Sequence, residues 1–147
     1  MTLLFSYGNL SYEEVRQFLL ETDNEFPTPL SEHVDIDAYA RKLSLFSDFA
    51  VCRDQGHIIG MISCYTNRPP LGYISNVCVK KQYQRRKVFS RLFCHLLSNM
   101  KDREITRLLL EVDADNDNAH SVYEHIGFRE LEIRSDTGKS LMELNLG

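Results

Sequence analysis

The feature that most constrains the fold is a series of three β-type segments in the middle of the chain. They cover about residues 49–52, 57–65 and 72–79, and each is rich in apolar, β-branched and aromatic side chains. Asp54-Gln55-Gly56, between the first two segments, favours a tight hairpin connection. Because strands joined so closely tend to pair with each other, the sequence predicts one sheet in this part of the chain.

One strand and two helices are expected before these segments. The strand covers about residues 2–7, and Ser11 with Glu14 forms a capping box that begins the first helix. The segment FPTPLS contains two prolines, which exclude a helix there. The second helix, over about residues 35–46, is therefore separated from the first by an irregular loop.

Two helices and three strands are expected after them. Apolar residues at helical spacing begin a helix at Val88. A strand over about 107–112, a short helix over 116–126 and a hairpin of strands over 128–134 and 141–146 complete the chain. The order βααβββαβαββ predicts an α/β (α+β) fold with a mixed, mostly antiparallel sheet flanked by helices. With 147 residues, 43% of them apolar, the chain is expected to form a single domain over residues 1–147.

The charge and the cysteines limit the classes of partner and the compartment. A formal net charge of −4 argues against a surface built throughout for nucleic acid or an anionic membrane, so any anion site must be local. The four cysteines stand singly in apolar runs, without a C-x-x-C pair, and are expected to be buried free thiols. Together with a start that lacks a signal-peptide pattern, they predict a cytoplasmic protein without a membrane span.

A strongly basic stretch follows the third β-type segment. Residues 80–91 include six lysines and arginines and no acidic residue. The first turn of a helix leaves backbone N–H groups unpaired and carries the positive end of the helix dipole, so this junction favours an anion such as phosphate. Further positive charge would come from Arg85, Arg86, Lys87 and Arg91. A solvated charged face and contact with nucleic acid phosphates are the alternative interpretations.

The stretch NDNAHSVYEHIGF, at residues 116–128, carries a second distinctive pattern. Asn116 suits the N-cap of a helix, and Gly127 suits the left-handed position after its last turn. The apolar positions step at helical spacing and are expected to face the core: Ala119, Val122, Tyr123 and Ile126. Helix formation alone explains every residue of this pattern.

In combination and in this order, the two stretches resemble the GCN5-related N-acetyltransferases, the GNAT family. The later family motif, N-x-x-A-x-x-x-Y-x-x-x-G-F, is matched at every fixed place by Asn116, Ala119, Tyr123, Gly127 and Phe128. The family's phosphate loop, Q/R-x-x-G-x-G/A, follows a strand that ends in valine. Val79 ends such a strand here, and Gln84 stands at the first position of the loop.

The chain departs from the family at two glycines of that loop, where Lys87 and Phe89 stand instead. Where φ is positive, glycine avoids a clash that costs roughly 1–2 kcal/mol for other residues. Charge-assisted hydrogen bonds, worth ~1.5–3 kcal/mol each, exceed that cost. Phosphate binding is therefore expected to survive in a reshaped loop.

The resemblance implies an acyltransferase that uses acetyl-CoA as the acyl donor, needs no metal, and passes the acetyl group directly to an amine. It implies these coenzyme-binding residues: Val77, Cys78, Val79, Gln84, Arg85, Arg86, Lys87, Val88, Phe89, Ser90, Asn116 and Ala119.

Two residues are the expected catalytic groups. Tyr123 stands at the family's general-acid position, and a neutral phenol can protonate a leaving thiolate or donate a hydrogen bond to it. Glu111, twelve residues earlier, stands in the L-E-V setting where the ribosomal-protein acetyltransferases of the family carry a base. A solvent-facing glutamate is the alternative, and Tyr73 or Asp113 acting through water are rival bases.

The resemblance places the acceptor near the loop between the first two helices. Phe26, Leu30 and Tyr73 are the expected substrate-binding residues. A small-molecule amine, such as an amino sugar or amino-acid derivative, is the first expectation, because a short single-domain chain leaves little room for macromolecular docking. A protein N-terminus or lysine is the alternative, followed by a GNAT fold without catalysis or a nucleic-acid-binding module. Neither nucleic acid nor membrane is expected as a partner, and a homodimer stays open.

Overall fold

The computed structural model describes residues 2–25, 28–84 and 87–147. Its strands are β1 (Leu3–Gly8), β2 (Ser47–Asp54), β3 (His57–Arg68), β4 (Leu71–Val79), β5 (Arg107–Asp113), β6 (Arg129–Arg134) and β7 (Lys139–Asn145). Its α-helices are α1 (Tyr12–Thr22), α2 (Ile36–Phe46), α3 (Val88–Asn99) and α4 (Asp117–Ile126). Short 3₁₀ turns lie at Asp23–Glu25, Leu30–Glu32, Lys81–Tyr83 and Lys101–Arg103. This order confirms the predicted βααβββαβαββ arrangement.

The strands form one mixed sheet in the order β1-β2-β3-β4-β5-β7-β6. Among the described strands, β4 and β5 alone pair in parallel, and the other neighbours are antiparallel. The predicted hairpin joins β2 to β3 through Gln55 and Gly56, whose φ angles of 50° and 83° are those of a tight turn that follows the twist of the strands. The prediction of a mixed, mostly antiparallel sheet is confirmed.

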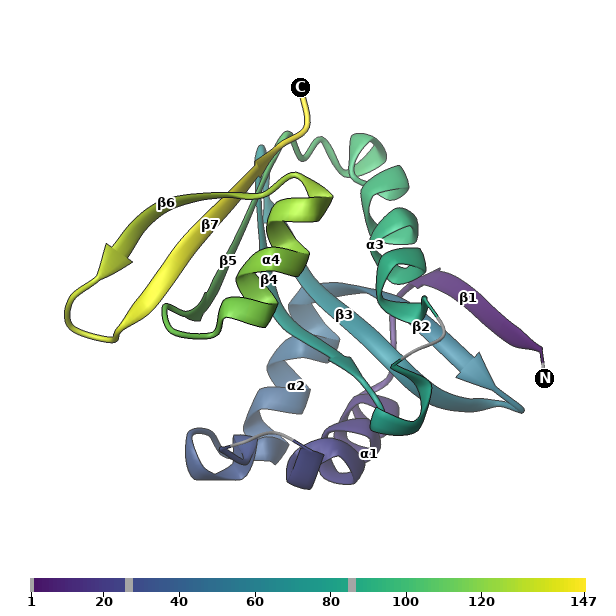
Figure 1. Cartoon of the computed structure of the whole chain (residues 1–147). Coiled ribbons are helices and arrows are strands. Elements are labelled where there is room, and N and C mark those ends of the chain that lie inside the picture. Colours follow the sequence, from purple (N-terminus) through teal and green to yellow (C-terminus); the bar gives the residue numbers. More distant parts are fainter. Residues whose placement is uncertain (1, 26–27, 85–86) are drawn as a thin grey trace.

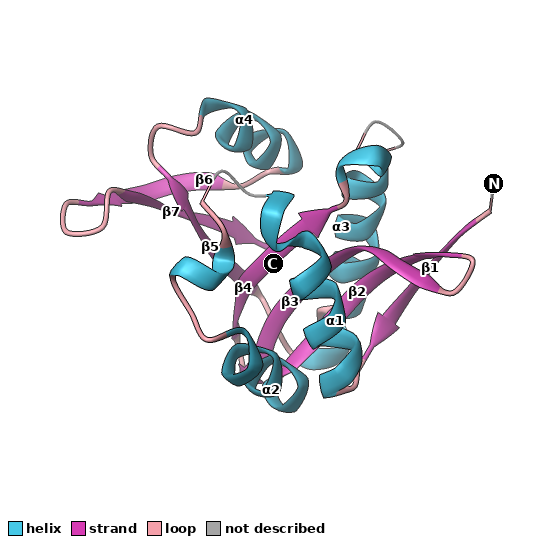
Figure 2. Cartoon of the chain, turned by 90° about the horizontal axis from the view of Figure 1, so that it is seen from below, coloured by secondary structure: helices cyan, strands magenta, loops and turns pink. Residues whose placement is uncertain are grey.

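Helices cover both faces of the sheet (Figures 1 and 2). On one face, α1 and α2 pack on the first strands around Phe18, Leu43 and Phe49, all of them buried. On the other face, α3 packs around Leu92, Phe93 and Leu96, and α4 lies beside it through Tyr123 and Ile126. The sheet therefore separates two compartments, one under each pair of helices.

Two details of the sequence analysis need correction. Cys52, Cys64 and Cys78 are buried as expected, but Cys94 is exposed, because it lies on the side of α3 opposite to the buried Leu92. The apolar stripe of α4 was predicted to be buried in the core, but no residue of this helix is fully buried and Val122 is 42% exposed. The apolar spacing was correct, but this face borders a cavity.

The separation of β4 from β5 is the feature of the fold that creates this cavity. The two strands pair over three residues only, from Leu71 opposite Arg107 to Tyr73 opposite Leu109. They approach closely at Gly72, where an added Cβ would lie 2.8 Å from a methyl carbon of Leu108. Beyond Tyr73, β4 continues along β3, while β5 continues along β7. The result is a wedge-shaped gap in the middle of the sheet.

Within the described part of the chain, no helix is long and apolar enough to cross a membrane.

Candidate active site

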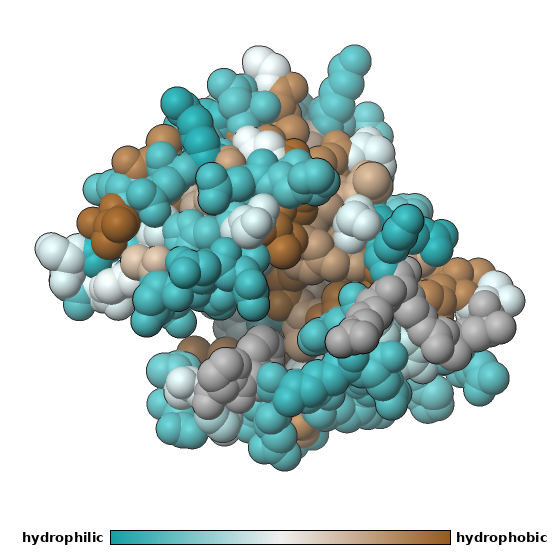
Figure 3. Space-filling model, viewed as in Figure 1, coloured by the Kyte–Doolittle hydropathy of each residue, from teal (hydrophilic) through white to brown (hydrophobic). Residues whose placement is uncertain are grey.

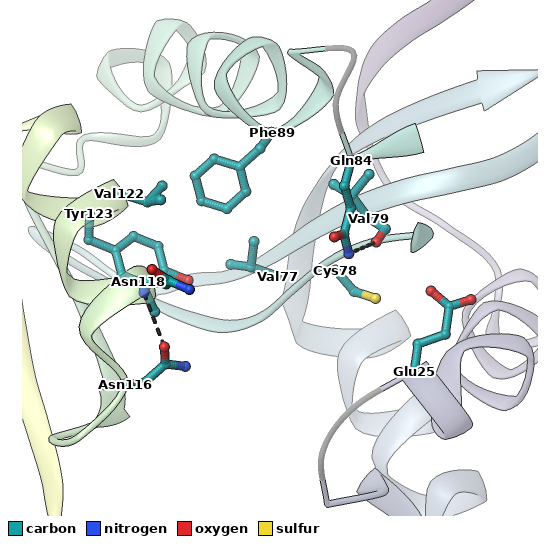
Figure 4. A pocket seen from close by; sticks show the side chains of 11 residues that line it. Glu25, Val77, Cys78, Val79, Gln84, Phe89, Asn116, Asn118, Val122 and Tyr123 are labelled. Atoms are coloured by element: carbon teal, nitrogen blue, oxygen red, sulfur yellow. Dashed lines mark hydrogen bonds between the residues drawn. The ribbon is translucent and has the colours of Figure 1, made fainter. Parts of the chain in front are cut away.

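A cavity of about 490 Å³ opens at this gap. In Figure 3, hydrophobic residues form the floor of a hollow between α4 and α3, and hydrophilic residues form its rim. The close-up in Figure 4 shows the side chains around it. The lining residues are Glu25, Val77, Cys78, Val79, Gln84, Phe89, Asn116, Asn118, Ala119, Val122 and Tyr123. Seven of them, Val77, Cys78, Val79, Gln84, Phe89, Asn116 and Ala119, are predicted coenzyme-binding residues, and Tyr123 is the predicted acid.

An aromatic cluster forms the wall between α3 and α4. The ring of Tyr123 lies 5.9 Å from that of Phe89, 6.1 Å from that of Phe93 and 5.8 Å from that of Phe128, measured between centroids. In Figure 4, Phe89 and Tyr123 project toward each other above Val77. Burial raises the pKa of the Tyr123 phenol to about 12, so it is neutral at physiological pH. Among the described residues, its hydroxyl has no hydrogen-bond partner.

The free edge of β4 offers backbone groups to the gap. The N–H of Lys80 donates to the carbonyl of Ile59 in the direction of β3, at 2.9 Å. Because successive residues of a strand direct their backbone groups to opposite edges, Val79 and Val77 face the gap. The carbonyl of Val79 already accepts a hydrogen bond from the side-chain amide of Gln84, at 2.9 Å. Among the described residues, the backbone N–H and carbonyl of Val77 and the N–H of Val79 have no partner on this edge, so they can bind an extended ligand.

The start of α3 lies beside this edge. Lys87 precedes the helix in the left-handed region, with φ 58° and ψ 21°, and its side chain makes no cap hydrogen bond. A lysine thus adopts a left-handed conformation at the position where the family motif has glycine. The first-turn N–H groups of Val88, Phe89 and Ser90 have no acceptor within the helix, as helix geometry requires. Arg85 and Arg86 lie outside the described residues.

Much of the remaining basic stretch is already engaged. Lys80 forms an ion pair with Glu21 at 2.7 Å, and the guanidinium of Arg91 lies 4.1 Å from the ring centre of Phe5. The backbone N–H of Lys81 donates to Glu25, whose carboxylate borders the cavity. Sequence reasoning missed Glu25, because this contact joins residues 56 positions apart.

The other end of the cavity is bounded by the start of α4. The side-chain oxygen of Asn116 accepts a hydrogen bond from the N–H of Ala119 at 3.1 Å, as expected for an N-cap. Gly127 ends the helix at φ 124°, and a Cβ there would lie 3.1 Å from Leu144. Among the described residues, neither the amide nitrogen of Asn116 nor the side chain of Asn118 has a hydrogen-bond partner, so both can bind a ligand. Sequence reasoning missed Asn118.

Glu111 lies on the opposite face of the sheet from Tyr123. Leu110 and Val112 pack in the compartment of α3, so the intervening Glu111 points to the other side. Its carboxylate accepts a hydrogen bond from the Tyr73 hydroxyl at 3.0 Å and lies 3.7 Å from the guanidinium of Arg134. Burial and the hydrogen bond to Glu111 raise the pKa of Tyr73 to about 12. The structure therefore brings Glu111 and Tyr73 together and sets Tyr123 across the gap from them.

The other candidate residues fall in different surroundings. Asp113 forms an ion pair with Lys139 at 3.2 Å. Leu30 packs against the core beneath α1 and α2. Phe26 lies outside the described residues. Over the described part of the chain, no group of three or more histidine, cysteine, aspartate or glutamate side chains could hold a metal ion.

Comparison with known proteins agrees with this geometry. Residues 12–128 match the model of the acetyltransferase (GNAT) family, so the chain belongs to this family of acetyltransferases. Enzymes of the family use acetyl-CoA as the acyl donor.

Two relatives and two solved structures illustrate the similarity. N-alpha-acetyltransferase 30 of Schizosaccharomyces pombe is 27% identical over 133 residues, which are 87% of this chain and 84% of that protein. The ribosomal protein bS18-alanine N-acetyltransferase of Escherichia coli is 39% identical over 59 residues, 40% of each chain. The crystal structure of the Escherichia coli ribosomal-protein-S18-alanine N-acetyltransferase has a TM-score of 0.81 at 20% identity, covering 98% of this chain and 95% of that one. The PaiA N-acetyltransferase of Thermoplasma acidophilum, solved in complex with coenzyme A, has a TM-score of 0.74 at 17% identity and covers 99% of both chains.

These relatives contradict one expectation. A small-molecule amine was predicted as the partner, yet the bacterial relative is named for acetylating an alanine of a ribosomal protein. The prediction was wrong because it assumed that a protein substrate needs a large docking surface, which a short chain could not provide. A relative covered over 84% of its length is similar in size to this chain, so a short domain is no obstacle.

Proposed function

We propose that this protein transfers the acetyl group of acetyl-CoA to the α-amine at the start of a protein chain. The observation that carries the proposal is the gap between β4 and β5, with Tyr123 on one face and Glu111 on the other. A thioester held in this gap is reached by an amine from the face of Glu111, while its sulfur lies on the face of Tyr123.

The chemistry of the residues around the gap supports acetyl-CoA as its ligand. The free backbone groups of Val77 and Val79 offer hydrogen bonds to an extended amide-containing arm, and Val122 and Phe89 supply apolar contact. The uncapped start of α3 supplies N–H groups for the pyrophosphate at Val88, Phe89 and Ser90. The other proposed coenzyme-binding residues are Cys78, Gln84, Lys87, Asn116 and Ala119, together with Arg85 and Arg86, which lie outside the described residues.

In the proposed reaction, Glu111 accepts the proton that the attacking amine must lose, directly or through a water molecule. The amine nitrogen forms a bond to the carbonyl carbon, and the bond between that carbon and sulfur breaks. Tyr123 donates its phenolic proton to the departing sulfur, or a hydrogen bond to its developing charge. The phenol can do so over a wide pH range, because burial keeps it protonated.

A route through an acetylated cysteine is the competing mechanism, since Cys78 borders the cavity. Burial raises the pKa of the Cys78 thiol to about 11, so almost none of it is thiolate at neutral pH. Because the thiolate is the nucleophilic form, direct transfer is favoured over a covalent intermediate.

The choice of a protein α-amine is supported by the names of the relatives, both of which are described as N-acetyltransferases of this kind. Only the first residues of a chain need to enter the gap, so a large interface is unnecessary. A lysine side chain is less suited to a base such as Glu111, since its pKa near 10.4 exceeds the ~7.7–8.0 of an α-amine. We also propose that the protein is cytoplasmic. Its four free cysteines support this location, because free thiols persist in a reducing compartment.

The test is acetylation of short synthetic peptides, followed by mass spectrometry. A peptide with a free α-amine and no lysine should gain one acetyl group, at a rate that depends on acetyl-CoA. The same peptide with a blocked N-terminus and one lysine is the matched control and should stay unmodified. Acetylation of the blocked peptide alone would contradict the proposal.

A further inference from the structure

A second cavity lies on the face of the sheet that carries Glu111. It has a volume of about 610 Å³ and lies between the end of α2, the end of β3 and the start of β4. Its lining residues are Lys42, Phe46, Tyr65, Asn67, Arg68 and Tyr73. None of these except Tyr73 stood out in the sequence, because they come from three separate elements.

Two cations border this cavity. Lys42 and Arg68 are both exposed, and among the described residues neither has a carboxylate partner. The ammonium of Lys42 lies 5.4 Å from the ring centre of Tyr65. By contrast, Arg107 and Arg129 of the same sheet share the buried carboxylate of Glu143. Lys42 and Arg68 therefore present unpaired positive charge to any ligand that enters the cavity.

The cavity adjoins the proposed site of reaction through Tyr73. This tyrosine lines the cavity and donates its hydrogen bond to Glu111. Arg68 pairs with Leu71, two residues before Tyr73 on β4, and two residues of a strand span about 7 Å. An amine placed at Glu111 would thus set the next side chain of an extended peptide within reach of Arg68.

We propose that this cavity binds an acidic side chain at the second residue of the substrate, so that the enzyme selects protein chains whose second residue is aspartate or glutamate. The inference rests on the proposed function, because it assumes that an α-amine reacts at Glu111. Lys42 and Arg68 are the specificity-determining residues, and Phe46, Tyr65 and Tyr73 hold the aliphatic part of the side chain.

The charge distribution favours this orientation. On this face, Glu111 would attract the α-ammonium. Three further carboxylates of the same face are already near cations: Glu143 pairs with Arg107 and Arg129, Asp113 pairs with Lys139, and Glu132 lies 3.8 Å from Arg134. An acidic peptide gains nothing from the protein as a whole, whose net charge is −4. Its selection must therefore come from local charges such as those of Lys42 and Arg68.

The experiment measures kcat/KM for amidated peptides that share alanine at the first position and carry Glu, Gln, Lys or Leu at the second. Glu should exceed Gln by about tenfold, and Lys should be poorest, as expected for charge-assisted recognition at a partly exposed site. An isomeric peptide with Glu moved to its far end controls for overall charge and should behave like the Gln peptide.

The matched variants are Lys42→Glu with Arg68→Glu, and Arg41→Glu as the control. Arg41 neighbours Lys42 on α2, but its guanidinium lies 4.4 Å from the ring centre of Tyr12, toward α1. The double variant should reverse the order of the Glu and Lys peptides, and the control should keep it. Both variants should retain the wild-type melting temperature, since the altered side chains are exposed.

The outcomes separate the two proposals. Acetylation without a preference for Glu, a preference for Leu, or an order unchanged by the double variant would overturn the acidic subsite and leave the proposed function standing. If no peptide with a free α-amine is acetylated, the proposed function fails and the inference fails with it.

Discussion

The two faces of the gap between β4 and β5 each carry a tyrosine, and their surroundings differ. Tyr123 lies in an aromatic cluster, where burial alone raises its pKa to about 12. Tyr73 has its pKa raised to about 12 by burial and by its hydrogen bond to Glu111. One face is apolar and preserves a proton donor, whereas the other is polar and keeps a carboxylate next to a phenol. One sheet thus places the proposed acid and the proposed base of a single transfer on opposite faces.

The largest expected effect is that of Tyr123→Phe. Removal of the hydroxyl keeps the ring contacts with Phe89 and Phe93 but removes the proton donor, so kcat should fall by about 10²–10³. The affinity for CoA should stay within about twofold, because the packing is preserved. Steady-state kinetics and calorimetry would measure the two effects. Tyr12→Phe, away from the gap, is the control. An unchanged kcat for Tyr123→Phe would show that Tyr123 is not the general acid.

On the other face, Glu111→Gln should lower kcat/KM by about 10–100-fold at pH 7, because the amide cannot accept the proton of the amine. The loss should shrink above pH 8, where more of the α-amine is already neutral. Glu132→Gln is the matched control, since Glu132 also lies near Arg134. A loss that stays constant with pH would indicate that Glu111 only positions Tyr73.

The pH dependence of the wild-type enzyme should show the same asymmetry. The rate should rise through the pKa of the α-amine, about 8, because the neutral amine attacks. The acid must stay protonated, and burial moves the pKa of Tyr123 upward from 10.0 to about 12. The rate should therefore begin to decline only when the pH exceeds about 10. A pH–rate profile of kcat/KM checks this, and a decline beginning near pH 8 would assign the acid to another group.

The smallest effect is expected at the start of α3. Lys87→Gly relieves the left-handed strain at φ 58°, so the affinity for CoA should stay unchanged or rise by up to about threefold. Glu104→Gly, at φ 59°, is a control for the relief of strain away from the gap. Thermal unfolding and calorimetry would compare them. A tenfold loss of affinity for CoA in Lys87→Gly would show that the lysine side chain itself binds the phosphates.

Features determined by neighbours in the sequence were predictable. The capping box at Ser11, the turn at Gln55-Gly56 and the caps of α4 depend on hydrogen bonds or φ angles within a few residues. The position of Tyr123 followed from the family motif, and the positive φ of Lys87 agrees with the glycine that the motif expects.

Features that depend on distant segments were not predictable. A helical stripe of apolar residues has the same spacing whether it faces a closed core or a cavity, so the exposure of Val122 could not be read from the sequence. Glu25 borders the cavity and accepts a hydrogen bond from Lys81, 56 positions later in the chain. Lys42 and Arg68 lie on different elements and meet only when α2 packs beside the end of β3.

The central claim is that the gap between β4 and β5 holds acetyl-CoA, and the most direct test is thermal unfolding at increasing acetyl-CoA concentration. Because a ligand that binds only the folded state stabilises it by RT ln(1 + [L]/Kd), the melting temperature should climb steadily once the concentration exceeds Kd. A melting temperature that stays constant up to millimolar acetyl-CoA would contradict the account.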